Sequence, residues 1–219
     1  MLNFPSTVGT IDRSEVEMRL SVILAVGLIA ALAAPSPSDP RFARNSVRVI
    51  ASAALSLEAA ARRAAGHGLT AHILSDAVEG EARDVARVHA AIAREVATRN
   101  RPFARPAVLL SGGETTVTVR GTGRGGRNTE FLLAFTLAID GLEAIAALAA
   151  DTDGIDGAGD NAGAVADGMT AARLRAAGID PRASLADNDA YTAFRAIGGL
   201  VLTGPTGTNV NDFRAILVR

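Results

Sequence analysis

Two arginines in a glycine-rich loop are the first candidates for chemistry. Arg124 and Arg127 lie in the loop over residues 121–128, directly before a predicted helix. The N-terminus of a helix presents unpaired N–H groups, and guanidinium groups form paired hydrogen bonds with oxyanions. This combination favours a site for a compact anion such as phosphate or carboxylate. A plain glycine-rich turn with solvated arginines is the alternative.

The same loop also fits a dinucleotide-binding pattern. Gly121, Gly123 and Gly126 satisfy G-x-G-x-x-G, and Glu143 lies 20 positions after Gly123. We expect the preceding strand to be the second arm of a hairpin, not the first strand of a βαβ unit, and a dinucleotide site relies on backbone N–H groups more than on arginines. A nicotinamide-dependent reductase is therefore an alternative, and the compact anion is favoured.

Four aspartates crowd the next polar loop. Asp151, Asp153, Asp156 and Asp160 fall within ten residues. Carboxylates this close repel one another unless a positive group lies among them. The spacing does not match an EF-hand, but one or two of these side chains are suited to a Mg²⁺ ion that is shared with phosphate oxygens. Capping of the local backbone and of the following helix is the alternative.

Two further polar loops flank predicted strands. The segment 203–212 is rich in threonine, glycine and asparagine, whose neutral donors suit a small polyhydroxy or phosphorylated ligand. An ordered loop that satisfies its own backbone is the alternative. The segment 111–115 is expected to form a hairpin turn, in which Glu114 is a base, a ligand partner or a solvated turn residue.

Composition excludes several classes of function. The chain has no cysteine, and all 22 of its basic residues are arginines. Disulfides, thiolate metal sites, a P-loop lysine and a Schiff-base lysine are therefore excluded within it. The net charge of −1 gives no electrostatic footprint for nucleic acid. The three histidines have no metal-binding spacing, and no G-x-S-x-G element supports a serine hydrolase.

Strands that alternate with helices must position these loops, which implies a layered α/β sheet. Val85, Val88, Ile92 and Val96 form the predicted apolar stripe of the second helix. Residues 144–150 fit either a strand or a buried helix. Helices are expected over 47–65, 78–98, 128–139, 162–177 and 188–197, and strands over 69–74, 107–110, 115–120, 200–203 and 213–218.

The N-terminal part differs in character from the rest. Residues 20–34 form a run of 15 without a charge, which is shorter than the roughly 20 residues of a membrane-spanning helix. A buried helix is favoured, and a signal-peptide h-region is the alternative. Three prolines within 35–40 interrupt the chain. The expected organisation is a segment 1–38, a helix–strand–helix segment 39–105 and a domain 106–219.

Five blocks of sequence, taken together and in order, resemble the MOFRL domain, the C-terminal domain of the glycerate 2-kinase family. Members of this family are often labelled hydroxypyruvate reductase. The segment 39–99 is similar to the part that precedes this domain, whereas 1–38 matches poorly. The resemblance implies a layered α/β sandwich with a mixed sheet. The five blocks begin at Ser111, Gly123, Asp151, Asn188 and Thr203.

The resemblance implies ATP-dependent phosphorylation of D-glycerate to 2-phosphoglycerate in the cytoplasm, with ATP and Mg²⁺, in a cleft between two domains. By residue match, Arg127 holds the substrate carboxylate or the transferring phosphate. Asp151 and Asp153 are the candidates for Mg²⁺ binding and hydroxyl positioning. The remaining candidate substrate-binding residues are Arg124, Glu114, Thr206, Thr208, Asn209 and Asp212.

This sequence departs from the family pattern in one large respect. Family members are much longer, and their N-terminal domain carries an active-site lysine, whereas this chain contains no lysine. We expect a truncated form that folds around the C-terminal domain and has little activity alone, with a separate chain as a potential source of the missing domain. A non-catalytic remnant that binds ligand is a further alternative. Neither nucleic acid nor membrane is an expected partner.

Overall fold

The computed structural model describes residues 35–36, 38–46 and 48–219. The helix and the signal-like segment that were alternatives for 20–34 lie outside the described residues. The chain divides into two compact units, Met1–Arg48 and Val49–Arg219. This division does not test the expected domain boundary near residue 105, which stays a prediction.

The described part of the first unit contains the short 3₁₀ helix η1 (Pro40–Phe42). Asp39 caps it, since its carboxylate accepts a hydrogen bond from the Arg41 backbone N–H at 2.9 Å. Within the residues that the structure describes, no helix is both long and apolar enough to cross a membrane.

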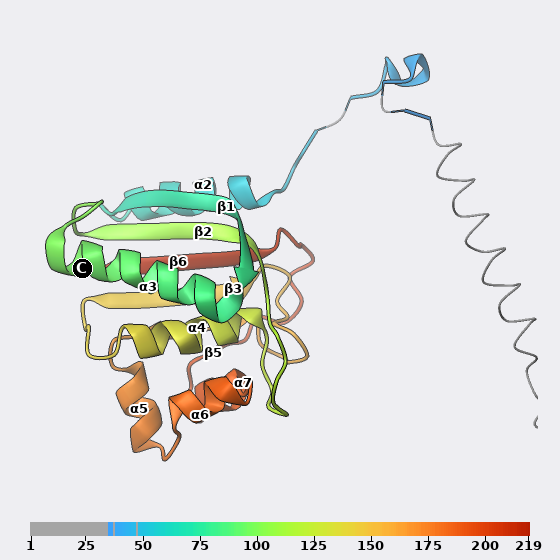
Figure 1. Cartoon of the computed structure of the whole chain (residues 1–219). Coiled ribbons are helices and arrows are strands. Elements are labelled where there is room, and N and C mark those ends of the chain that lie inside the picture. Colours follow the sequence, from blue (N-terminus) through green and yellow to red (C-terminus); the bar gives the residue numbers. More distant parts are fainter. Residues whose placement is uncertain (1–34, 37, 47) are drawn as a thin grey trace, which may run out of the picture. The chain divides into compact units, whose positions relative to one another are not determined.

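A six-stranded mixed sheet forms the centre of the second unit, so the predicted α/β class is confirmed (Figure 1). Its order is β1-β2-β6-β3-β4-β5. β1 and β2 pair in parallel, and every other neighbouring pair is antiparallel. The strands are β1 (Thr70–Glu81), β2 (Ala107–Thr116), β3 (Ile145–Asp151), β4 (Gly163–Asp167), β5 (Leu200–Val201) and β6 (Asp212–Val218).

The order of the strands brings distant loops to one edge of the sheet. β6 is antiparallel to both β2 and β3, so β2 and β3 run in the same direction. The loops after β2 and β3 therefore leave from the edge at which β6 begins. Together with the loop that precedes β6, these are the three loops in which the sequence places most of the candidate site residues.

Helices cover the two faces of the sheet unequally (Figure 1). α3 and α4 lie on one face, with the short α5, α6 and α7 beside α4, and α2 lies on the other face against β1 and β2. The helices are α2 (Ala53–Ala65), α3 (Ala82–Arg99), α4 (Arg127–Ala138), α5 (Thr170–Ala176), α6 (Pro181–Ala186) and α7 (Ala190–Ala196).

The core lies between the sheet and the α3–α4 layer. α4 is buried from Asn128 to Thr136, as expected for a helix enclosed by a sheet and other helices. α3 packs through alanines, including Ala86, Ala90 and Ala93, whose small side chains allow close approach. The predicted stripe is confirmed at Val96, which is buried, and at Val85 and Ile92, which pack against the core, but it is wrong at Val88, which is 59% exposed.

The predicted hairpin around 111–113 is wrong. β2 continues through both glycines and pairs in parallel with β1, which itself extends to Glu81 into the predicted start of the next helix. Gly113 has a φ of +119°, and a Cβ at this position would overlap the Val78 backbone. The glycines thus allow two strands to approach at an irregularity in their register, where the sequence suggested a turn.

Other boundaries differ for local reasons. The predicted helix over 162–177 is a strand, β4, followed by α5, because β4 pairs with β3. The ambiguous segment 144–150 is the strand β3. The first helix begins at Ala53, not at residue 47, since the Ser52 hydroxyl accepts a hydrogen bond from the Leu55 N–H at 3.2 Å and caps it. The predicted helices over 128–139 and 188–197 are confirmed as α4 and α7.

His89 is a buried polar residue of this core. Its Nδ1 lies 2.9 Å from the Val85 carbonyl oxygen and its Nε2 lies 3.0 Å from Ser111 Oγ. Since Nδ1 must donate to the carbonyl, Nε2 accepts from the hydroxyl of Ser111, which is the arrangement of a neutral ring. Burial lowers the pKa of His89, and the charge of nearby Arg214 lowers it further.

The first prediction concerns Gly113. We expect Gly113→Ala to lower the free energy of unfolding by about 2–5 kcal/mol, because a side chain meets both an unfavourable φ and the Val78 backbone. Gly141→Ala is the matched control, since its φ is +81° with no atom within 4 Å of the added Cβ, and it should cost about 1–2 kcal/mol. Urea denaturation measures both, and equal losses would contradict the close approach of the strands.

The second prediction concerns pH. Because the folded-state pKa of His89 is lowered, the unfolded state binds more protons below its ordinary pKa of about 6.5. The stability that comes with a neutral, buried His89 is therefore fully present above about pH 6.5. The free energy of unfolding then decreases as the pH falls towards the folded-state pKa of His89. Urea denaturation between these values should show an excess slope of up to about 1.4 kcal/mol per pH unit over His89→Gln. His67→Gln, at an exposed position, should keep the wild-type slope.

Candidate functional site

Arg127 is the residue on which the candidate site is built. It is the first residue of α4, and its side chain reaches the acidic residues at the ends of β3 and β6. Nε donates to Asp212 at 2.7 Å, Nη2 donates to Asp151 at 2.5 Å, and Nη1 lies 3.6 Å from the Glu114 carboxylate. Two carboxylates therefore fix the guanidinium, and the Nη1 edge faces the more open side.

The charge of Arg127 is secured by these contacts. Burial acts to lower the pKa of Arg127, but the hydrogen bond that it donates to Asp212 and the charges of Asp212, Asp151 and Glu114 outweigh this effect and raise the pKa. The side chain of Arg127 is 25% exposed to solvent. A fixed, partly accessible guanidinium of this kind is suited to a phosphate or carboxylate oxygen.

Asp212 lies at the centre of the cluster. Its carboxylate is fully buried, and besides Arg127 it accepts hydrogen bonds from Asn128 Nδ2 at 2.8 Å and Arg214 Nη2 at 2.5 Å. The Thr115 backbone N–H lies 3.3 Å from the same carboxylate. The sequence predicts Asp212 as a substrate-binding residue, whereas the structure engages its oxygens with protein donors. In this arrangement it holds Arg127 and does not face a ligand.

Arg214 is the second arginine of the cluster, two residues beyond Asp212 on the same face of β6. Its side chain has no exposed surface and lies over the Phe131 ring, with 5.1 Å from Cζ to the ring centroid. Burial lowers the pKa of Arg214, while the adjacent Asp212 opposes that shift. Among the described residues, its Nε and Nη1 have no hydrogen-bond partner. Asp212 is thus its principal counter-charge.

The N-terminus of α4 is already occupied by a carboxylate of the chain itself. Asp156 is 1% exposed, and its two oxygens accept hydrogen bonds from the N–H groups of Asn128 and Thr129 at 2.9 and 2.8 Å. Burial raises the pKa of Asp156, and the donors of α4 counteract the shift. A Cβ on Gly126 would overlap this carboxylate. The backbone donors predicted to bind an external anion are therefore satisfied internally.

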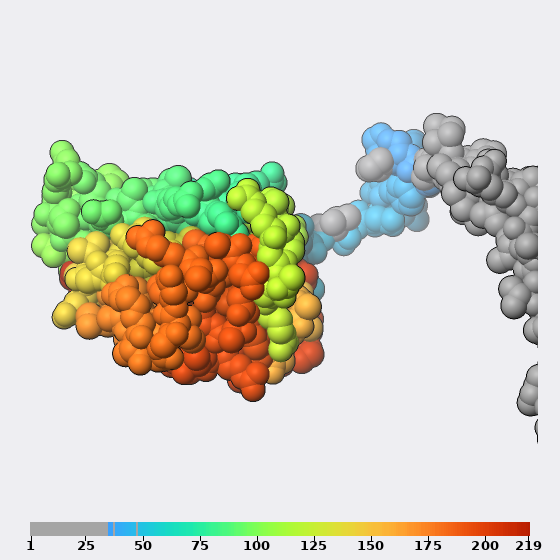
Figure 2. Space-filling model, turned by 60° about the horizontal axis from the view of Figure 1, so that its bottom comes forward, coloured from blue at the N-terminus to red at the C-terminus, as the bar shows by residue number. Residues whose placement is uncertain are grey.

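The glycine-rich loop packs against the segment before α7. In Figure 2 the yellow-green strip of this loop lies along the orange surface formed by α6 and α7. Side chains on Gly121 or Gly123 would overlap Asp187 and Asp189. Asn188 fastens the contact, since its Oδ1 accepts from the N–H groups of Arg120 and Gly121 at 2.7 and 3.1 Å. These glycines serve chain packing, which does not favour the dinucleotide interpretation.

The predicted metal ligands Asp151 and Asp153 lie close together but are engaged. Asp151 is paired with Arg127, and it also accepts a hydrogen bond from the Asp153 N–H at 3.2 Å. Asp153 accepts from the Ile155 N–H at 2.8 Å. In the described part of the chain, no group of three or more histidine or acidic side chains is arranged to hold a metal. These residues do not form a protein-held Mg²⁺ site, because a cation there would compete with the guanidinium of Arg127.

The loop before β6 is tied to the aspartate loop. The Thr206 hydroxyl donates to the Thr152 carbonyl at 2.5 Å, and Asn209 Nδ2 donates to Asp153 at 3.3 Å. Thr208 donates its backbone N–H to the Thr206 hydroxyl at 3.3 Å. Many polar groups of this loop are therefore hydrogen-bonded within the loop or to the aspartate loop, as expected for an ordered loop that satisfies its own backbone. Their role in binding a ligand stays a prediction.

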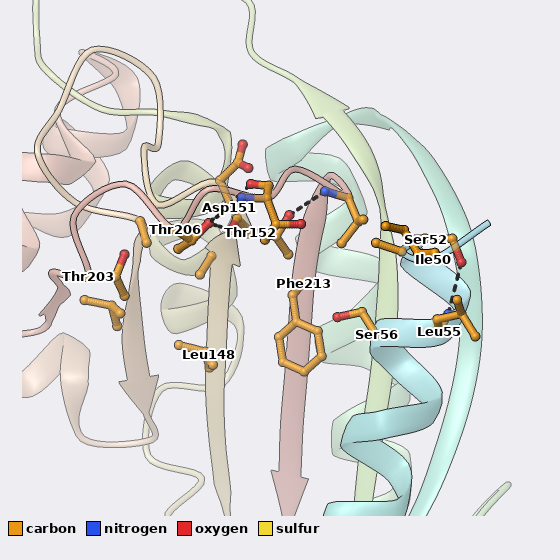
Figure 3. A pocket seen from close by; sticks show the side chains of 16 residues that line it. Ile50, Ser52, Leu55, Ser56, Leu148, Asp151, Thr152, Thr203, Thr206 and Phe213 are labelled. Carbon is orange, nitrogen blue, oxygen red and sulfur yellow. Dashed lines mark hydrogen bonds between the residues drawn. The ribbon is translucent and has the colours of Figure 1, made fainter. Parts of the chain in front are cut away.

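A mostly apolar groove of about 570 Å³ opens on the face of the sheet opposite α4 (Figure 3). Phe213 and Leu148 form its floor, Leu55 of α2 lines one side, and Thr206 lies at its upper rim. Thr208 also lines it. The groove contains no arginine and one carboxylate residue, Asp151, whose side chain is paired with Arg127 on the other face. Its chemistry does not suit a small anionic substrate.

Arg124 and Arg127 do not share a site, contrary to the prediction from the loop. Arg127 points to Asp151 and Asp212, whereas the guanidinium of Arg124 stacks on the Tyr191 ring at 4.4 Å from Cζ to the centroid. Glu114 lies in β2, not in a turn, and is the most exposed partner of Arg127 with 58% of its side chain accessible.

Sequence reasoning missed three residues that shape the site: Asp156 as the cap of α4, Arg214 and the role of Asn188. Arg214 was detectable in principle, because alternate residues of a strand share a face and Asp212-x-Arg214 places two opposite charges together. Asp156 and Asn188 gave no such signal, since their partners are 27 to 70 residues away.

The third prediction tests the buried charge cluster. We expect Asp212→Asn to lower the free energy of unfolding by about 3–5 kcal/mol, because it leaves Arg214 buried without its counter-charge. Arg214→Met should cost less, since Asp212 keeps its ion pair with Arg127. The double variant should lose clearly less than the sum. The exposed pair Asp167–Arg173 is the control, and Arg173→Gln should cost about 0–1 kcal/mol. Additive losses in urea denaturation at the buried pair would refute the coupling.

Comparison with known proteins identifies the family. Residues 107–212 match the MOFRL family. The chain is 47% identical over 171 residues to a glycerate 2-kinase of Pyrococcus horikoshii, covering 78% of this chain and 39% of that protein. It is 56% identical over 176 residues to an Agrobacterium vitis protein that carries a hydroxypyruvate reductase name, covering 80% and 46%.

A solved structure gives the same result. The crystal structure of glycerate kinase from Thermotoga maritima superposes with a TM-score of 0.78 at 37% identity, covering 91% of this chain and 49% of that one. The match thus spans less than half the length of the Pyrococcus horikoshii and Agrobacterium vitis proteins. Through its MOFRL domain over residues 107–212, this chain belongs to the glycerate 2-kinase family and corresponds to the C-terminal part of those enzymes.

Proposed function

We propose that this protein takes part in the ATP-dependent phosphorylation of D-glycerate to 2-phosphoglycerate, a cytoplasmic reaction. The single observation that carries the proposal is the guanidinium of Arg127, which is fixed by Asp151 and Asp212 while 25% of the side chain stays exposed. Phosphoryl transfer depends mainly on positioning and on stabilisation of charge on the transferring group. An arginine that is fixed in this way can position the transferring group and stabilise its charge without a change in its own conformation.

The roles of the neighbouring residues follow from their contacts. Arg127 binds either the glycerate carboxylate or the transferring phosphoryl group. Asp153, which is less buried than Asp151, is the candidate to accept a hydrogen bond from a substrate hydroxyl. Glu114, Thr206, Thr208 and Asn209 remain proposed contacts at the margin of the site. Asp212 acts through Arg127 as a positioning residue.

ATP and Mg²⁺ are proposed as the cosubstrate and its metal. The glycerate 2-kinases among the relatives support ATP use. Mg²⁺ keeps several waters and commonly binds through substrate phosphates with one or two carboxylates, so it is expected to arrive with ATP. We derive no step through the metal, because Asp151 and Asp153 are both engaged in contacts within the protein.

We further propose that these 219 residues have little activity alone. The matched residues cover only 39% and 46% of two of these relatives. The cluster around Arg127 supplies one wall of a site and no lysine. A separate chain that carries the remaining domain would complete it.

A nicotinamide-dependent hydroxypyruvate reductase is less well supported. Its pyrophosphate would need the N–H groups at the start of α4, and the Asp156 carboxylate occupies them. The observations in its favour are the G-x-G-x-x-G pattern and the name of the Agrobacterium vitis relative.

The fourth prediction is a chimera. Residues 49–219 replace the corresponding C-terminal part of the Pyrococcus horikoshii enzyme, and 2-phosphoglycerate formed from D-glycerate, ATP and Mg²⁺ is quantified by mass spectrometry. We expect turnover by the chimera, little product from the 219 residues alone, and a loss of about 10³-fold or more in kcat/KM for the chimera with Arg127→Ala.

Each outcome has a defined meaning. Arg182→Ala, an exposed arginine on α6, is the matched control and should leave turnover unchanged. A folded chimera without product would reject the kinase proposal, and turnover by the 219 residues alone would reject only the proposal of low activity. Oxidation of NADH with hydroxypyruvate would favour the reductase.

A further inference from the structure

A polar hollow is lined by residues other than those of the Arg127 cluster. Its volume is about 600 Å³, and it forms between the glycine-rich loop, the loop after β3 and α7. Unlike the groove of Figure 3, it carries two arginines. Its lining residues are Arg124, Ala158, Gly159, Asp160, Tyr191, Arg195, Leu200 and Leu202.

Tyr191 organises this hollow. Its backbone N–H donates to the Arg124 carbonyl at 2.9 Å, its ring carries the Arg124 guanidinium, and its hydroxyl donates to Asp160 at 2.8 Å. This hydrogen bond lowers the pKa of Asp160 and raises that of Tyr191. Arg195 follows one helical turn after Tyr191, which places both on one side of α7. Arg124 is therefore held on a built framework, and Arg195 lines the same hollow.

The charges of the hollow are not balanced. Neither Arg124 nor Arg195 forms an ion pair within 4 Å with any residue of the described part of the chain, whereas most of the arginines around the core do. The two guanidinium groups and the single carboxylate of Asp160 leave one net positive charge. Two guanidinium groups offer many N–H donors, and a phosphate group has enough oxygens to accept from both at once.

We propose that this hollow binds the phosphate group of a small organic phosphate, with Arg124 and Arg195 as the anion ligands. Leu200 and Leu202 form an apolar wall, and Leu202 is 64% exposed. That wall suits the carbon frame of such a ligand. The site is separate from Arg127 and does not depend on the proposed kinase function.

The chain itself provides a specific reporter for this site. It contains one tyrosine and no tryptophan, so its intrinsic emission comes from Tyr191 alone. Titration with inorganic pyrophosphate at constant ionic strength should change this emission in a saturable way. Acetate at the same ionic strength should not, because a single carboxylate cannot engage both arginines equally well.

The variants give the expected result a residue-level pattern. Arg124→Gln and Arg195→Gln should each raise the apparent Kd for pyrophosphate at least about tenfold, because each removes a charge-assisted hydrogen bond. Asp160→Asn should lower it, since the competing carboxylate is removed. Arg182→Gln, an exposed arginine on α6, is the charge-matched control and should have little effect.

Several results would overturn the proposal. They are the absence of a saturable change in wild-type emission, an equal weakening by Arg182→Gln, and equal saturation by acetate. Because Arg124 and Arg195 are exposed, their variants should fold like the wild type, and circular dichroism verifies this.

Discussion

The carboxylate of Asp212, placed between the guanidinium groups of Arg127 and Arg214, is the interaction on which the site depends. Three charged groups with little or no access to water are costly unless each is paired. The pairing requires α4, β2 and β6 to meet at one point, since Asn128 and Thr115 complete the shell of donors. The position of Arg127 is therefore set by the fold as a whole and not by its own flexible loop.

The mixed sheet makes this meeting possible. Because β6 runs antiparallel between β2 and β3, its first residue lies beside the last residue of β3, and Asp151 pairs in register with Asp212. Two neighbouring acids would repel each other, but Arg127 bridges them. A purely parallel sheet would have placed the start of the last strand at the opposite edge. The antiparallel insertion of β6 is thus the topological condition for the cluster.

The sequence was informative where periodicity and local pattern act, and less so where contacts are distant. The α/β class, α4 and β6 follow from local signals. Gly112-Gly113 looks like a turn locally, and only the approach of Val78 from β1 explains it as part of a strand. Arg124 and Arg127 are three residues apart, yet their partners lie on α7 and on β3 and β6. The family resemblance supplied the candidate residues, but the partners of each side chain required the structure.

The filling of the α4 N-terminus by Asp156 explains why the arginines carry so much of the anion chemistry. A helix start with free N–H groups would bind phosphate through the backbone, and the glycine-rich loop would serve as its cradle. Here those groups bind a carboxylate of the same chain, and the glycines admit Asp156, Asp187 and Asp189. Anion recognition on this face must then come from side chains. Guanidinium groups held beforehand by carboxylates or an aromatic ring can supply it without rearrangement, which is the condition for effective charge stabilisation.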